Sequence, residues 1–198
     1  MGFLLSRGLD IAARDSDGES ALHKSAKGGQ KEVIRVFLNS GADVMAEDTH
    51  GRTALHKAAT SGNRAVVSLL LEKGATISAG IDGRTVLHFA GNEEITSALL
   101  SKGADANARA QSVLSEEDFF ENNFSAGRTP PWHWAAYEGS DDYFRLLVKY
   151  GAEVDALNVT LRTRPQEAIF WGHVVVVKAL LELGASVHKK DNEGWRSL

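Results

Sequence analysis

The hexapeptide Gly18-Glu-Ser-Ala-Leu-His23 is followed 33 residues later by Gly51-Arg-Thr-Ala-Leu-His56. The same shift relates Gly41 to Gly74. Self-similarity at a fixed period of this size is typical of proteins built from stacked structural repeats. We therefore expect the chain to fold as an array in which each unit packs on the next.

The residues of each repeat predict two helices and a turn-bearing finger. A hydroxyl residue that can cap a first helix is followed three residues later by a histidine, in the pairs Ser20 and His23, Thr53 and His56, and Thr85 and His88. The apolar run at residues 66–71 predicts a second helix with a buried stripe. Gly41 and Gly74 then stand where a left-handed residue ends that helix.

These motifs resemble the ankyrin-repeat family, in which Gly-x-Thr-Pro-Leu-His opens the first helix and Gly-Ala-Asp-Val-Asn follows the second. Later repeats carry the same marks in Gly83-Arg-Thr-Val-Leu-His88 and Gly151-Ala-Glu-Val-Asp155. The resemblance implies an all-α ankyrin-repeat solenoid of stacked helix-turn-helix layers with β-turn fingers. It implies a single domain over 1–198, with a partial repeat at 1–14, repeats at 15–47, 48–79, 80–108, 109–156 and 157–190, and a partial repeat at 191–198.

Two repeats depart from the common length. His88 and Gly103 are 15 residues apart where His56 and Gly74 are 18 apart, so about one helical turn is missing from the third repeat. The fourth repeat holds an insertion over 112–126, with four acidic residues, no basic residue and three Phe. Because both ends of the chain fall inside a repeat, we expect a longer parent chain with further repeats or domains.

Composition and charge exclude several classes of protein. The net charge of −4 gives no general attraction to nucleic acid or to anionic lipid. The absence of Cys excludes disulfides, thiolate metal sites and a cysteine nucleophile. The chain has neither a signal-peptide core nor a run of eighteen apolar residues. We therefore expect an intracellular protein, cytoplasmic or nuclear, with no membrane contact and no nucleic-acid partner.

The seven histidines are the residues most open to a catalytic or metal-binding interpretation. Five stand at the capping position or at the start of a second helix and are predicted to be structural: His23, His56, His88, His133 and His173. His50 and His188 stand singly on fingers, without a second ligand at metal spacing. Phosphate-loop and nucleophile-elbow motifs are absent. We predict no metal, no cofactor and no catalytic residue.

The resemblance also implies a concave groove, lined by the first helices and the fingers. Its exposed positions hold lysines in the first two repeats, Lys24, Lys27 and Lys57, and aromatic residues further along. Surface aromatics are enriched in binding hot spots. The predicted contact residues are Phe89, Phe119, Phe120, Trp132, Trp134, Tyr137, Phe170 and Trp171. Alternatively, the aromatics pack beneath the insertion as a local core.

A column of arginines adds a second candidate surface. The residue after the finger glycine, or its equivalent, is in successive layers Glu19, Arg52, Arg84, Arg128, Arg162 and Arg196. Stacked layers would set these arginines in a row that can meet an acidic partner or a phosphate backbone. The other interpretation is that arginine here only keeps the turns soluble.

We predict a non-enzymatic protein-protein interaction scaffold that binds another protein or peptide through the aromatic groove and the acidic insertion of repeats three to five. The alternative is an enzyme or small-ligand binder with a pocket in the same region. That pocket would be lined by Trp132, His133, Trp134, Tyr137, Phe170 and Trp171. His133, with Glu138, Asp141 or Asp142, would supply its acid and base groups.

Overall fold

The computed structural model describes residues 10–81, 83–108, 140–155, 166, 168–169, 172–186, 188, 190 and 194. The chain divides into two compact units, residues 1–104 and residues 105–198. The regular structure described in both units is almost entirely helical. The all-α class predicted from the repeats is confirmed.

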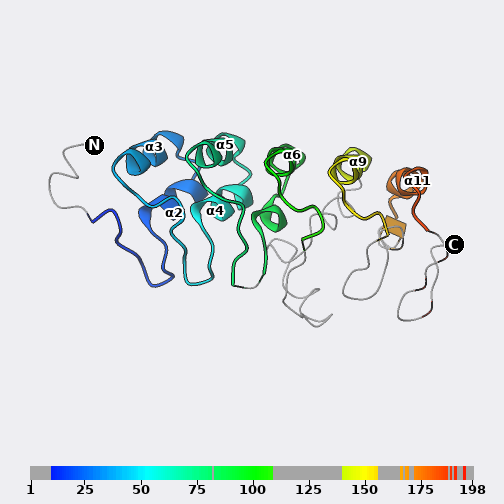
Figure 1. Ribbon diagram of the computed structural model, residues 1–198, viewed down its shortest axis with the longest axis horizontal. Coiled ribbons are helices and arrows are strands. Elements are labelled where there is room, and N and C mark those ends of the chain that lie inside the picture. Colours follow the sequence, from blue (N-terminus) through cyan, green and yellow to red (C-terminus); the bar gives the residue numbers. More distant parts are fainter. Residues whose placement is uncertain are drawn as a thin grey trace. The chain divides into compact units, whose positions relative to one another are not determined.

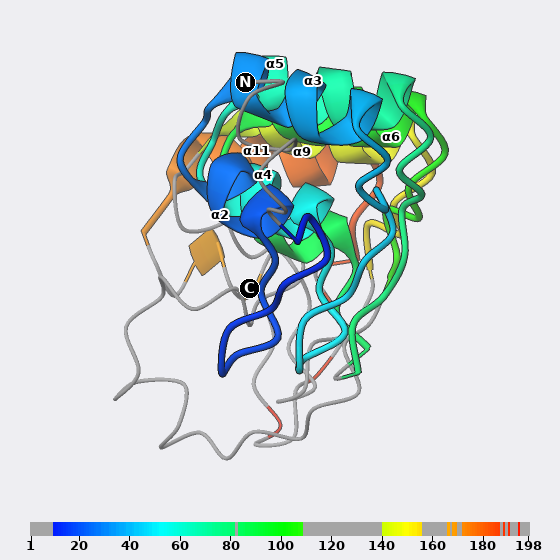
Figure 2. The ribbon, with the colours of Figure 1, turned by 90° about the vertical axis from the view of Figure 1, so that its left-hand side faces the viewer.

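The first unit contains helical layers, each with an inner helix, an outer helix and a finger. The inner helices are α2 (Ala21–Lys27), α4 (Ala54–Thr60) and the short 3-10 helix η1 (Val86–Phe89). The outer helices are α3 (Lys31–Asn39), α5 (Arg64–Glu72) and α6 (Glu93–Ser101). Figure 1 shows the outer helices in one row and the inner helices in a second row. The fingers extend beyond the inner row, as the rotated view in Figure 2 also shows.

Each inner helix of the first unit begins with the predicted capping box. Ser20, Thr53 and Thr85 each accept a hydrogen bond from the third helical residue, and their own backbone amides donate to the histidine at that position. The distance from the Thr53 amide to His56 Nδ1 is 3.1 Å. Because Nδ1 accepts this hydrogen bond, the neutral ring carries its own proton on Nε2. His23 Nε2 then reaches the carbonyl of Arg52 in the next layer at 3.0 Å.

The missing turn of the third repeat is taken from its inner helix. α4 has seven residues, whereas η1 has four and is followed by Ala90, whose backbone is extended. The outer helix of this repeat keeps the full nine residues of α5. The sequence-based expectation of a shortened third repeat is therefore confirmed, and the shortening is confined to the groove side of the layer.

The core of the first unit lies between the layers. Four leucines predicted from the repeat pattern are at most 2% exposed: Leu55, Leu69, Leu70 and Leu87. The small residues Ala26, Ala58 and Ala59 are fully buried and let adjacent inner helices approach closely. Since one layer cannot bury its own apolar face, these contacts between layers provide most of the stability.

The second unit is described through two outer helices and parts of its inner helices and fingers. α9 (Asp141–Lys149) and α11 (Val174–Glu182) contact each other. Phe144 and Leu147 of the former, and Val176 and Leu180 of the latter, are fully buried. Among the described residues of both units, no helix is long and apolar enough to cross a membrane.

Candidate functional site

Most of the predicted contact surface lies outside the described residues. Phe89 is the one member of the predicted set that the structure describes. The other predicted contact residues and the insertion at 112–126 lie outside the described residues. These contact residues are Phe119, Phe120, Trp132, Trp134, Tyr137, Phe170 and Trp171. His133 and Glu138 of the alternative pocket also lie outside the described residues. Their roles therefore remain predictions.

Phe89 is buried, not exposed in a groove. Its side chain is 7% exposed, and its ring meets the His56 ring edge-on, with the centroids 5.5 Å apart. The guanidinium carbons of Arg52 and Arg84 lie 5.1 and 5.9 Å from the Phe89 centroid. The expectation that Phe89 stands open to a partner is wrong, because cation-π contacts and the neighbouring layer cover the ring.

The predicted arginine row is not an open charged edge at the two positions that the structure describes. Arg84 is only 6% exposed and Arg52 is half-buried. Both guanidinium groups lie against Phe89. A planar guanidinium can lie against an aromatic face while it keeps its charge, so Arg52 links its layer to the next, whereas Arg84 covers Phe89 within its own layer. The remaining arginines of the column lie outside the described residues.

The lysine positions of the first two repeats are largely neutralised. Lys57 Nζ lies 2.5 Å from Glu19 Oε1 and 2.7 Å from Asp48 Oδ2, and the Asp48 side chain is 1% exposed. Burial alone would lower the pKa of Lys57, but its hydrogen bonds to Asp48 and Glu19 outweigh burial and raise it. Lys24 pairs with Asp15 at 2.7 Å. The groove of these repeats is therefore less basic than its lysine count predicts.

One contact between layers changes its chemistry from repeat to repeat. Glu19 of the first layer holds Lys57 of the second. At the same two positions one layer further on, Arg52 covers Phe89. The third repeat also has Gly80 where the second has Asp48, so both members of the Lys57–Asp48 ion pair are replaced together. Comparing aligned positions across adjacent repeats could have revealed this exchange.

The pKa of His56 makes the stability of the first unit sensitive to acid. Burial lowers the pKa of His56 to about 4, and the charge of Arg52 acts in the same direction. An unfolded histidine titrates near 6.5, so between pH 6.5 and about pH 4 the unfolded chain binds more protons than the native one. We expect the His56 contribution to the free energy of unfolding to fall through this window by up to about 1.4 kcal/mol per pH unit and to level off below it. The lowered pKa values of Asp15 and Asp48 extend the loss of stability to lower pH.

Urea unfolding of the parent and of His56→Gln across this pH range tests that expectation. The variant should be less stable at neutral pH because the capping box is weakened, and its pH dependence should be flatter. Burial also lowers the pKa of His23, which leaves some slope in the variant. Identical slopes in the two proteins would contradict the assigned role of His56.

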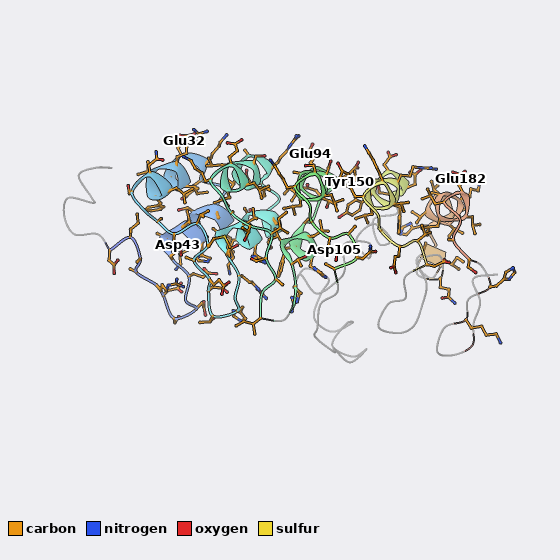
Figure 3. The ribbon with its side chains drawn as sticks, in the orientation of Figure 1. Glu32, Asp43, Glu94, Asp105, Tyr150 and Glu182 are labelled. Carbon is orange, nitrogen blue, oxygen red and sulfur yellow. The ribbon has the colours of Figure 1, made fainter. Side chains whose placement is uncertain are left out.

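A second hollow, the outer groove, lies between the outer helices α5 and α6 and has a volume of about 660 Å³. Small or apolar side chains line part of it, including Ser68, Leu71 and Ser97. Charged residues such as Arg64 and Glu94 stand around them, 3.9 Å apart. Figure 3 shows Glu94 extending outward from α6.

Within the described residues, no group of three His, Cys, Asp or Glu side chains is placed to hold a metal ion.

Exposed apolar side chains gather near the start of α11 in the second unit, a feature that the sequence analysis did not single out. Val174 and Val175 are 64% and 60% exposed, and Ile169, just before the turn into α11, is 40% exposed. At the corresponding positions of the first repeat, α3 begins with the charged residues Lys31 and Glu32. Exposed apolar side chains of this kind, when clustered, often mark contact surfaces.

Comparison with known proteins agrees with the repeat architecture. The family model for ankyrin repeats (3 copies) matches residues 1–81, 49–110 and 78–158, and the ankyrin repeat model matches residues 166–192. The chain belongs to the ankyrin-repeat family. Proteins of this family are generally protein-protein interaction scaffolds.

A curated relative from Oryza sativa subsp. japonica, the probable E3 ubiquitin-protein ligase XBOS32, is 35% identical over 65 residues. That match covers 33% of this chain and 13% of the relative. The chain therefore matches only a small part of that protein.

Proposed function

We propose that this chain is a non-enzymatic interaction module that binds another protein or peptide. Its contact surface is the groove of repeats three to five together with the acidic insertion at 112–126. The observation that supports a protein partner most directly is the exposed apolar surface of the fifth repeat at Ile169, Val174 and Val175. The two valines begin the outer helix α11, so they support a contact by this repeat and not the groove itself. Open apolar surface suits a macromolecular partner, whereas a small ligand needs an enclosing cavity.

The chemistry of the described groups supports a binding role. His23, His56 and His88 are fully buried, and their Nδ1 atoms accept hydrogen bonds from backbone amides in the capping boxes. An imidazole used in this way cannot exchange protons with a substrate in the groove. The similarity to a probable ubiquitin ligase covers 65 residues, 13% of that protein, so we propose no ligase activity.

A comparative pull-down tests the proposal. The parent protein, the double variant Trp134→Ala/Trp171→Ala and the control Lys27→Ala are immobilised at equal amounts, after circular dichroism has shown equal helix content. Lys27 is an exposed groove residue of the first repeat. We expect the parent and Lys27→Ala to retain the same bound proteins and the double variant to lose them. Retention of the same proteins by all three would place the contact surface elsewhere.

A further inference from the structure

One finger position joins consecutive repeats by a side-chain hydrogen bond. It is the fourth residue after the glycine that ends each outer helix. In the second unit Asn107 Oδ1 accepts the backbone N–H of Glu153 at 2.8 Å, and Asp155 Oδ1 accepts that of Ser186 at 2.8 Å. In each case the donor is the second residue after the corresponding glycine of the next repeat. The position therefore works as a staple between layers.

In the first repeat this position is occupied by Met45. Its sulfur accepts the backbone N–H of Thr76 at 3.3 Å and the Thr76 hydroxyl at 3.5 Å. A thioether is a weak acceptor compared with an amide or carboxylate oxygen. In the second repeat the equivalent Ser78 hydroxyl is buried and makes no hydrogen bond. The staple at Met45 thus has the right donors but a poor acceptor atom.

Met45 is also open to oxidation. The chain has no Cys and two Met residues, and Met45 is half-exposed. Hydrogen peroxide converts an accessible thioether into a sulfoxide. In this reaction the sulfur attacks one peroxide oxygen, the S–O bond forms as the O–O bond breaks, and the second oxygen leaves as water after a proton transfer. The sulfur is oxidised by two electrons and the peroxide is reduced by two.

We propose that Met45 is a peroxide-reactive modification site, and that its sulfoxide strengthens the contact between the first and second repeats. The sulfoxide oxygen is placed on the atom at which two Thr76 donors already converge. It supplies the kind of acceptor that Asn107 and Asp155 provide elsewhere. The flexible methionine side chain can withdraw to make room for it, and a half-exposed site does not force the polar group into an apolar core.

This strengthening is opposite to the usual effect of methionine oxidation, which disrupts apolar packing. Two variants separate the effect of an oxygen acceptor from the effect of oxidation. Met45→Asn supplies an oxygen acceptor without oxidation, whereas Met45→Leu supplies no acceptor and cannot be oxidised. Met1 is present in all three proteins and so controls for oxidation at the other sulfur.

The test treats parent, Met45→Asn and Met45→Leu with millimolar hydrogen peroxide, locates added oxygen by peptide mass spectrometry, and measures amide hydrogen exchange at Thr76. Oxidation of the parent should slow exchange at Thr76 by about threefold to tenfold, the range of one added hydrogen bond. Met45→Asn should show this slower rate without peroxide, and Met45→Leu should not respond. The proposal fails if Met45 resists peroxide that oxidises a free methionine peptide. It also fails if oxidation leaves Thr76 exchange unchanged or faster.

Discussion

Replacing Leu70 by Ala is expected to lower the free energy of unfolding by about 2 to 5 kcal/mol. Leu70 lies on the buried stripe of α5 and is fully inaccessible to solvent. The substitution removes apolar surface and leaves a cavity that the packed layers fill only in part. Urea unfolding followed by circular dichroism at neutral pH measures the loss.

Leu71→Ala is the matched control, since it makes the same change at the next residue of the same helix. Leu71 is half-exposed and lines the outer groove between α5 and α6. Its replacement should cost about 1 kcal/mol or less. A Leu70 variant as stable as the Leu71 variant would show that the repeat register assigned to this layer is incorrect.

Replacing Gly51 by Ala is expected to cost about 2 to 5 kcal/mol, for two separate reasons. The backbone of Gly51 has φ of 70°, where a side chain adds about 1 to 2 kcal/mol. A Cβ atom there would also lie 2.9 Å from the backbone nitrogen of Ile81, whose amide donates to the His50 carbonyl at 3.0 Å. The substitution therefore pushes apart two neighbouring fingers.

Gly74→Ala separates the two contributions. Gly74 has φ of 92°, but a Cβ atom there would meet nothing within 4 Å. This control should lose only the conformational part, about 1 to 2 kcal/mol. Thermal and urea unfolding of both variants give the difference, which reports the contact between fingers. Equal losses in the two variants would contradict the close approach of Ile81 to Gly51.

The features that could be predicted from the sequence are those set by near neighbours in the chain. A capping box needs a hydroxyl and a histidine three residues apart, so the structural roles of His23, His56 and His88 follow from local spacing. The buried leucines follow from the same repeat pattern. These features depend little on which residues other layers bring.

The environments of Lys57 and Phe89 could not be predicted in this way. Lys57 meets Glu19, which is 38 residues away in the chain, and Phe89 meets Arg52 of the preceding layer. Part of the cover on each residue comes from the preceding layer, which a single repeat does not reveal. A prediction that treats groove positions one at a time assigns both residues to the surface.

The contact surface itself is a prediction about repeats three to five. Its aromatic residues other than Phe89, and the insertion at 112–126, lie outside the described residues. Because Phe89 is buried, the proposed contact surface is reduced to the remaining predicted aromatics, the insertion and the exposed apolar residues of the fifth repeat.

The most direct test is a calorimetric titration of a captured partner against four proteins: the parent, Trp134→Ala, a deletion of 112–126 and Lys27→Ala. We expect Trp134→Ala and the deletion each to weaken binding by roughly thirtyfold or more, the effect of losing a hot spot. Lys27→Ala should bind within about twofold of the parent, as an exposed charge does. Affinities of Trp134→Ala and of the deletion equal to that of the parent would contradict a binding surface in repeats three to five.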